Sequence, residues 1–359
     1  MFSAFFSKDS WKNTLNGIWF VALFAMSAIY LKKEFQIFQD FSISPLIIAI
    51  VLGMLYSNFL KKGFPEQWTP GITFSAKLIL RAAIILYGFR LTFQQIVAVG
   101  IPGLMVDLIM VVSTFLIGSI VAIKLLKLDW QTSFLTASGA SICGAAAVLA
   151  TEPVVKAEAH KSAIAVSTVV LFGTISMFLY PILFNSGFLP SLGMDLATYG
   201  IYVGATVHEV AHVVGAGVSC GMVSCDTSVI IKMGRVILLV PFLIILGWYL
   251  AKMSADGEKG TAKLVIPWFA IGFLIVAGFN SLHLLPETVV KTIIFIDDLM
   301  LAMAMAALGL STDFAKFKEV GMKPIYAALV MFLWLLVGGY FITIGITSLL
   351  GSGGHAFPM

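Results

Sequence analysis

Long apolar runs separated by short polar connections occupy most of this chain of 359 residues. A helix needs roughly 20 apolar residues to cross the hydrocarbon core of a bilayer. Nine runs meet this requirement, and we expect each of them to be a transmembrane helix. They span residues 13–31, 43–60, 70–89, 97–123, 161–184, 228–251, 264–281, 289–310 and 324–350.

Two further segments, residues 131–156 and 198–225, are rich in small and polar residues and have glycines at their centres. Such segments are typical of broken or re-entrant helices, which a membrane tolerates only where they line a cavity enclosed by protein. We therefore expect an all-α membrane protein with nine transmembrane helices and two re-entrant or broken helices. If both segments cross the membrane fully, the chain has eleven spans.

The chain also resembles itself at an offset of 221 residues, with one residue of slip in places. This comparison pairs Gly88 with Gly309, Pro45 with Pro267, and Asn58 with Asn280. The two glycine-centred segments match each other as well. In the second half, however, the broken segment comes before the other matched helices rather than after them, which indicates a circular permutation.

We therefore expect a single transmembrane domain, residues 1–359, that contains two repeats of five elements. The first repeat is 43–184, the second and permuted repeat is 198–350, and helix 13–31 is extra. If both broken segments are hairpins, all matched pairs run in opposite directions, as in the inverted repeats of many transporters.

The distribution of cations supports hairpins. With hairpins, most loop lysines gather on one side of the membrane, and the other side holds Lys32, Lys33, Arg90 and Lys291. Positively charged loops favour the cytoplasm. We therefore expect two hairpins that enter from opposite faces, a cytoplasmic N-terminus and an external C-terminus.

Composition agrees with this class, because 60% of the residues are hydrophobic and 11% are charged, whereas soluble domains carry about 25% charged residues. The net charge of +4 adds little, and nothing indicates a nucleic-acid partner. No G-x-x-x-x-G-K-[ST] motif is present, so we expect no cofactor and a transport energy that comes from an ion gradient. Whether Cys220 and Cys225 pair stays open.

Ionisable residues within predicted spans are costly in a membrane and are functional candidates. Lys77 and Arg81 lie one turn apart in helix 70–89, and Asp297 and Asp298 lie in its repeat partner. Because the offset aligns Lys77 with Asp298, we expect these two residues to approach each other. They form either a structural ion pair or a coupling site that exchanges a proton or sodium.

Glycines, hydroxyls and unpaired backbone N–H groups gather in the two broken segments. At the N-terminus of a half-helix such groups bind anions, although small residues also favour close helix packing. The candidate substrate-binding residues are Ser138, Gly139, Ser141, Cys143, Gly144, Gly204, Thr206, His208 and Glu209. Lys232 and Arg235 either snorkel to the interface or form an electropositive approach for an anion, and Asp107 is expected to pair locally.

Residues 208–212 read HEVAH and match the H-E-x-x-H motif. On a helix the two histidines could bind zinc, with the glutamate as general base, so an intramembrane metalloprotease is a second class of function. A catalytic zinc needs a third protein ligand, and the sequence does not fix His283, Asp297 or Asp298 in that role. A polar hairpin at a transport site fits better, so we expect no metal, no catalytic residue and no enzyme.

Three ordered motifs resemble a known family. They are Gly-Ala-Ser-Ile-Cys-Gly-Ala at 139–145, Gly-Ala-Thr-Val-His-Glu-Val-Ala-His at 204–212, and Ala-Ala-Leu-Gly-Leu-Ser-Thr-Asp at 306–313. They are similar to a family of bacterial multi-pass inner-membrane proteins named as sulfate exporters. The resemblance implies secondary transport, with a plan related to cation/proton antiporters and bile-acid-type symporters. In that family the position of His212 is often glutamine, which counts against zinc.

We therefore expect a secondary active transporter in the bacterial cytoplasmic membrane. Its substrate is expected to be a small anion, such as a sulfur oxyanion or an organic sulfonate, coupled to a proton or sodium gradient. The alternatives are the metalloprotease and an anion channel or non-transporting sensor. The expected partners are the lipid bilayer, the anion and the coupling ion, and a homo-oligomer is left open.

Overall fold

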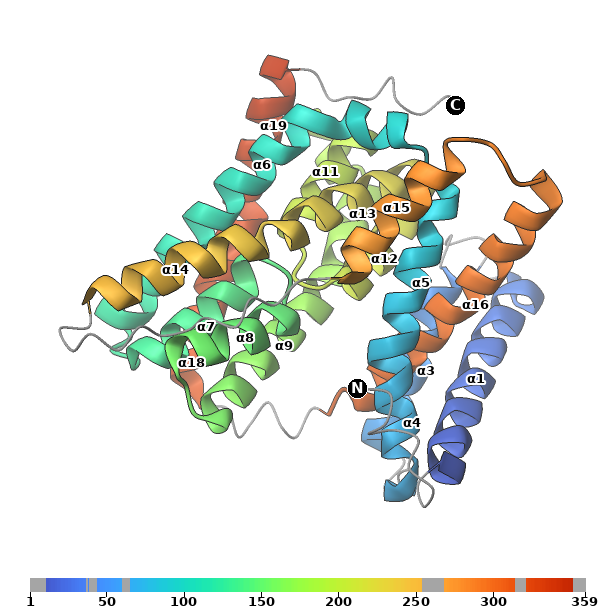
Figure 1. Ribbon diagram of the computed structural model, residues 1–359, viewed down its shortest axis with the longest axis horizontal. Helices are drawn as coiled ribbons and strands as arrows, with labels where there is room; N and C mark the ends of the chain where they lie inside the picture. The colour runs from blue at the N-terminus through green and yellow to red at the C-terminus, as the bar shows by residue number, and fades with distance from the viewer. Residues whose placement is uncertain are drawn as a thin grey trace. The chain divides into compact units, whose positions relative to one another are not determined.

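The computed structural model describes residues 11–36, 38, 44–59, 65–253, 268–313 and 321–350. Within these ranges all regular structure is helical (Figure 1). Seven helical stretches are long and apolar enough to cross a membrane, which confirms the prediction of an all-α, multi-pass membrane protein. These are Trp11–Glu34, Glu66–Arg90, Gly100–Leu125, His160–Asn185, Met222–Lys252, Glu287–Ser311 and Met322–Leu350.

Two more of the predicted spans are shorter apolar helices in the structure. Helix α3 is Pro45–Phe59, with 15 residues, and α15 is Trp268–Asn280, with 13 residues. The predicted limits at 43, 60 and 264–267 lie outside the described residues. A count of nine membrane spans therefore stays a prediction.

The chain divides into two compact units, which the sequence did not predict. Unit 1 contains residues 1–93 and 269–315, and unit 2 contains residues 94–268 and 316–359. Two helices of each proposed repeat belong to unit 1. They are α3 and Glu66–Arg90 in the first repeat and the two helices that match them in the second. The remaining three elements of each repeat belong to unit 2.

Glycines bring the helices of unit 1 into close contact. In α16 (Glu287–Ser311) a Cβ added to Gly309 would overlap the carbonyl of Ile50 and lie 3.0 Å from the Met54 nitrogen, both in α3. Another glycine of this unit, Gly88, meets the same kinds of backbone atom in its neighbouring helix. A Cβ on Gly88 would lie 2.7 Å from the Phe273 carbonyl oxygen and 3.0 Å from the Ala277 nitrogen, both in α15. The two helix pairs therefore pack alike.

Two asparagines of unit 1 also make matching hydrogen bonds. Asn58 Nδ2 donates to the carbonyl oxygen of Thr312 at 2.8 Å, and Asn280 Nδ2 donates to that of Leu91 at 3.0 Å. Both acceptors lie just beyond the end of a long helix, where carbonyl groups lack helical partners. Thr312 is 221 residues after Leu91, which is the offset of the sequence comparison.

The first broken segment of unit 2 is an antiparallel helical hairpin. It consists of α7 (Trp130–Ser141) and α8 (Ala145–Val155). At the open end of the hairpin, Gln131 Nε2 donates to the carbonyl oxygens of Val155 at 3.1 Å and Lys156 at 3.0 Å. The chain therefore returns to the level at which it entered the segment.

The second broken segment, α11 (Leu196–Thr206) and α12 (Val210–Val218), is also a hairpin. Both helices pack on α13 (Met222–Ile237). Along α11, Gly200 approaches Ser224 and Gly204 approaches Ser228, so α11 and α13 run parallel. In α12 it is the last turn that meets the start of α13, since Ser224 Oγ donates to the Gly217 carbonyl oxygen at 2.5 Å. The start of α11 and the end of α12 thus lie at the same end of α13.

One predicted boundary is wrong. The second broken segment ends at Val218, and Cys225 lies in α13, because Gly221 at φ 119° ends the connection and a new helix starts at Met222. The predicted span 228–251 lies within the apolar stretch Met222–Lys252, which consists of α13 and α14 (Leu239–Met253) with a turn at Leu238. Cys143, Cys220 and Cys225, all within the described residues, form no disulfide.

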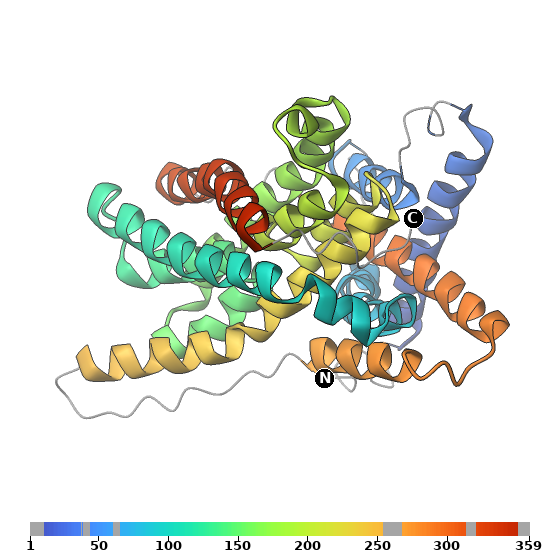
Figure 2. The same ribbon diagram turned by 90° about the horizontal axis from the view of Figure 1, so that it is seen from above.

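The remaining long helices of unit 2 are α6 (Phe93–Ile120) and α9 (Ala159–Asn185), together with α18 (Met322–Leu333) and α19 (Gly339–Leu350). The C-terminal helices lie along α6 in both views (Figures 1 and 2). Trp334 Nε1 donates to Ser113 Oγ at 3.2 Å, and a Cβ on Gly118 would overlap the sulfur of Met331.

We expect Gly309→Ala to lower the thermal unfolding temperature of the purified protein. The added methyl group meets α3 backbone, and overpacking of this kind costs about 1–3 kcal/mol. Gly278→Ala is the matched control, because a Cβ at Gly278 in α15 meets nothing within 4 Å. Equal unfolding temperatures for the two variants would contradict the close α3–α16 packing.

Candidate functional site

The two hairpins of unit 2 begin with the same cap. Asp129 accepts a hydrogen bond from the Thr132 nitrogen at 3.1 Å, and Asp195 accepts one from the Thr198 nitrogen at 2.7 Å. Partial burial alone would raise the pKa of Asp129, but the Thr132 hydrogen bonds and the nearby Lys161 ammonium hold it below its usual value. These caps fix where the first helix of each hairpin starts.

Both hairpins break at equivalent places. Helix α7 ends at Ser141 and α11 ends at Thr206, 65 residues later, and the second helix of each hairpin begins four residues further on. At the first break Gly144 has φ 76° and ψ −137°, a conformation that side chains disfavour. At the second break Val207 and Glu209 are extended. Each break leaves backbone carbonyls without helical partners inside an apolar protein.

Lys232 of α13 bridges the two breaks. Its ammonium group donates to the Ile142 carbonyl oxygen at 2.8 Å and to the Val207 carbonyl oxygen at 2.6 Å. These carbonyls are again 65 residues apart, so the lysine contacts the same position in both hairpins. The side chain is completely buried. The two breaks therefore lie side by side and share one cation.

Arg235, one turn further along α13, adds a second bridge. Its guanidinium donates to the carbonyl oxygen of Ser141, with 2.7 Å from Nε, and to that of Ala205. Arg235 is also 0% exposed, so of the two alternatives for Lys232 and Arg235 the burial contradicts snorkelling to the interface, and the electropositive approach for an anion stays a prediction. Both cations lie at the negative C-terminal ends of α7 and α11, which favour positive charge.

Asp107 of α6 supplies negative charge beside these cations. It is 1% exposed and interacts electrostatically with Arg235 and Lys232. Its Oδ2 lies 3.5 Å from the place of a Cβ on Gly234. The expectation of local pairing is wrong, because the opposite charges come from α13. Two buried cations in the sequence could have indicated that a distant carboxylate is needed.

Glu209 reaches from the second break to the first hairpin. Its Oε1 accepts a hydrogen bond from the Ala145 nitrogen at 3.2 Å, at the N-terminus of α8. A Cβ on Gly144 would overlap the Glu209 side chain, so only glycine leaves room for it. Glu209 Oε2 lies 3.7 Å from Nδ1 of His212, and His212 Nε2 lies 3.4 Å from Thr174 Oγ1 in α9.

The other candidate residues of the breaks are buried and contribute mainly to helix structure. The hydroxyls of Ser138, Ser141 and Thr206 bond to carbonyl oxygens of their own helices, Leu135, Ser138 and Tyr202. Gly139 and Gly204 allow close packing, since a Cβ on Gly139 would lie 2.7 Å from Val148 Cγ2 and one on Gly204 would lie 2.6 Å from the Ser228 carbonyl oxygen. Cys143 and His208 are buried at the breaks.

The HEVAH segment does not form the helix that a zinc site would need. Helix α12 starts at Val210, so His208 and Glu209 precede it and do not share a helical face with His212. Among the described residues, no group of three His, Cys, Asp or Glu side chains could hold a metal ion. In this geometry His208 and His212 do not form the i, i+4 pair that the H-E-x-x-H motif presents on a helix.

The candidate coupling residues lie in unit 1. Arg90 pairs with Asp297 at 2.9 Å and with Asp298 at 2.7 Å. Asp297 is fully buried, whereas the Asp298 side chain is 60% exposed. The sequence pattern places Arg90 in a loop and gives no sign of its pairing with Asp297 and Asp298. The guanidinium of Arg81 lies 5.9 Å from the centre of the Phe269 ring.

The predicted approach of Lys77 to Asp298 is wrong. Lys77 is exposed, and it precedes Arg90 by thirteen residues in the continuous helical stretch Glu66–Arg90. At 1.5 Å per residue, Lys77 therefore lies about 20 Å along the helix from Arg90, the residue that pairs with Asp298. Positions that align in two repeats are related by symmetry, and this does not bring them into contact.

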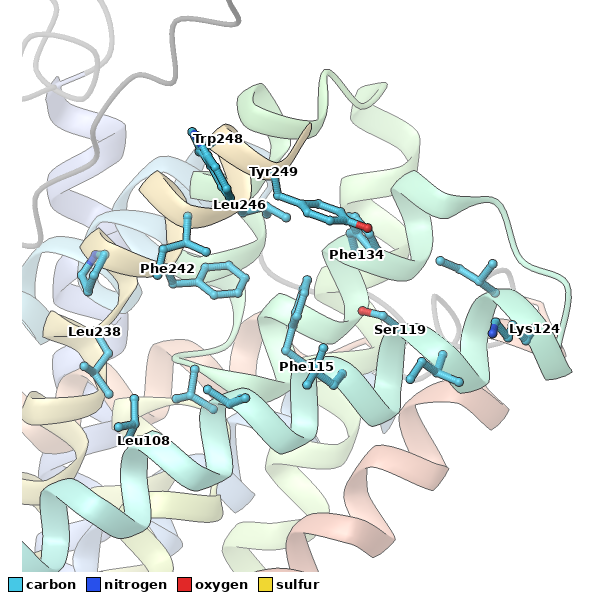
Figure 3. A pocket seen from close by; sticks show the side chains of 17 residues that line it. Leu108, Phe115, Ser119, Lys124, Phe134, Leu238, Phe242, Leu246, Trp248 and Tyr249 are labelled. Carbon is cyan, nitrogen blue, oxygen red and sulfur yellow. The ribbon is translucent and has the colours of Figure 1, made fainter. Parts of the chain in front are cut away.

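A large cavity of unit 2 has a different chemistry. It measures about 530 Å³ and lies between α6, α7 and α14, where Phe115, Phe134 and Phe242 line it (Figure 3). The lining residues with polar groups are Ser119, Lys124, Trp248 and Tyr249. No residue of the two breaks lines it. Its wall suits apolar chains rather than a small anion.

Comparisons with known proteins give one consistent result. A sequence model described as "Conserved hypothetical protein 698" matches residues 16–328. A UPF0324 membrane protein of Bordetella pertussis is 49% identical over 92% of this chain and 94% of its own length. The UPF0324 inner membrane protein YeiH of Escherichia coli is 50% identical over 82% of this chain and 84% of its own length. No solved structure matches.

We expect Arg90→Gln to destabilise the protein strongly, because it leaves the buried Asp297 carboxylate without its cation. Breaking a buried ion pair in this way costs roughly 3–5 kcal/mol. Lys77→Gln, on the same helical stretch, should leave the thermal unfolding temperature almost unchanged, because Lys77 is exposed. A larger loss for Lys77→Gln than for Arg90→Gln would contradict the assigned pairs.

Proposed function

The chain belongs to the UPF0324 family of membrane proteins, and we propose that it is a secondary active transporter that carries a small anion across the bacterial cytoplasmic membrane. The observation that carries this proposal is the contact of Lys232 with both helix breaks. Paired broken helices with unwound backbone at their centre are typical of substrate sites in secondary transporters. An enzyme or a structural protein has no need for two such breaks held by one cation.

The proposed architecture is nine spans and two re-entrant hairpins in two inverted repeats. The matching hydrogen bonds of Asn58 and Asn280 support the repeat, as do the equal positions of the two breaks. The return of each hairpin to the level of its start supports the re-entrant assignment. In this arrangement the N-terminus is cytoplasmic and the C-terminus is external.

The chemistry of the breaks favours an anion. Lys232 and Arg235 place two positive charges in a buried region, and the N-terminal ends of α8 and α12 add partial positive charge. A sulfur oxyanion or an organic sulfonate offers several acceptor oxygens for such donors. The coupling ion is a proton or sodium, and the acidic groups available for it are Glu209 at the breaks and Asp297 and Asp298 in unit 1.

We expect sulfate, thiosulfate or methanesulfonate to raise the thermal unfolding temperature of the purified protein, because a ligand that binds the folded state stabilises it. A ligand at 100 times its Kd adds about 2.7 kcal/mol. Lys232→Gln should lose this stabilisation, whereas Lys252→Gln, at an exposed position in α14, should keep it. A stabilisation that persists in folded Lys232→Gln would place the anion elsewhere, and no stabilisation by any panel anion would count against an anion transporter.

We expect the re-entrant arrangement to place Glu158 and Pro190 on opposite sides of the membrane. Each position is replaced by a single cysteine in a background without Cys143, Cys220 and Cys225. A membrane-impermeant thiol reagent should then label position 158 from the cytoplasmic side and position 190 from outside. Labelling of position 158 from outside would overturn the hairpin topology and restore eleven spans.

A further inference from the structure

We propose that Glu209 is a tethered anion that competes with the transported anion for the N-terminus of α8. Glu209 gives up this position when it takes up a proton. The inference rests on the proposed function of the two breaks as the substrate site, and it specifies how that site is loaded and why loading consumes a proton.

The first observation is that a carboxylate already occupies the place where an anion would bind. The Ala145 nitrogen, at the start of the 11-residue helix α8, donates to Glu209 Oε1 at 3.2 Å. This carboxylate comes from the other hairpin, and its side chain passes over Gly144. The helix end therefore binds an anionic group, as its free N–H groups and its dipole predict.

The second observation is a buried ring nitrogen beside this carboxylate. His212 is 0% exposed, and its Nδ1 faces Glu209 Oε2 at 3.7 Å, too far for a hydrogen bond. Nδ1 of His212 has no hydrogen-bond partner within the described part of the chain. Buried polar atoms are normally hydrogen-bonded. Its lack of a partner beside the carboxylate indicates that this site accommodates a further polar group.

The charge balance explains the proton. Lys232 and Arg235 are offset by Asp107 and Glu209, so the buried cluster is formally neutral. A monovalent anion that entered it would bring one uncompensated negative charge, which is costly away from water. Protonation of Glu209 forms one O–H bond on the carboxylate, removes one negative charge and releases the Ala145 N–H for the anion. One proton is thus taken up with each monovalent anion that enters.

Glu209 can receive this proton, since its side chain is 16% exposed, whereas Asp107 is buried. The ionisable groups around it come from several elements. They are Lys232 of α13, Cys143 of the first break, His208 and His212 of its own hairpin, and Asp107 and Arg235, which act through Lys232. Glu209 is the partly exposed acid of this group and is therefore assigned as the proton acceptor.

The test measures anion affinity against pH with the purified full-length protein. The probes are sodium sulfate and sodium methanesulfonate, which stay ionised between pH 5 and 8. Methanesulfonate affinity of the wild-type protein should rise by up to about tenfold for each pH unit of acidification, as linkage to one proton requires. Glu209→Gln should bind tightly at every pH, because it lacks the competing charge. Glu152→Gln, a carboxylate change within α8, should keep the wild-type pH dependence.

A second measurement needs no variant. In weakly buffered solution at pH 7, methanesulfonate binding should take up one proton per anion, which a pH-sensitive dye reports. Binding without proton uptake, or a wild-type pH dependence in Glu209→Gln, would overturn the role of Glu209 and leave the proposed transport function standing. Failure of both probes to bind wild-type protein and variants at any pH would contradict the proposed function itself.

Discussion

The unpaired backbone of two broken helices is the constraint on which unit 2 depends. A break in a membrane-embedded helix exposes carbonyl groups that apolar surroundings cannot satisfy. The structure satisfies them with Lys232, whose donors reach matching carbonyls in both hairpins, and with Arg235, which donates to the carbonyl oxygens of Ser141 and Ala205. The same contacts stabilise two cations that would be costly to bury alone. Neither the breaks nor the buried charges are stable without the other.

This mutual dependence also orients the proposed site. Because the cations bond to the C-terminal ends of α7 and α11, the N-terminal ends of α8 and α12 are left for other partners. An anion then meets a set of donors that is held in place before it arrives, which limits the loss of freedom on binding. The arrangement fits a transporter, where the same site must be loaded and emptied repeatedly.

The sequence predicted the helices and the two breaks well, because apolar length and central glycines report directly on membrane crossing and on helix interruption. The repeat comparison also identified Asn58 and Asn280, whose hydrogen bonds match in the structure. It failed where an interaction joins distant segments. The sequence pattern places Arg90 in a loop and leaves Asp107 without an obvious partner. In both cases the oppositely charged residues lie on a helix that is distant in the sequence, and the local pattern does not indicate which helix packs there or which of its faces points inward. The division into two units was missed for the same reason.

The backbone of the two breaks follows the repeat, but the side chains do not. Lys232 contacts positions 142 and 207, which are related by the repeat, yet the repeat partner of Glu209 is Gly144. An acid at both positions would place two carboxylates beside each other over one pair of cations, and like charges at short distance oppose each other. With glycine at one position, a single carboxylate crosses to α8 while the N-terminus of α12 receives no acid from the other hairpin. The two half-helix ends therefore differ chemically although they match in geometry, and in the mechanism that we propose this difference lets one site respond to both an anion and a proton.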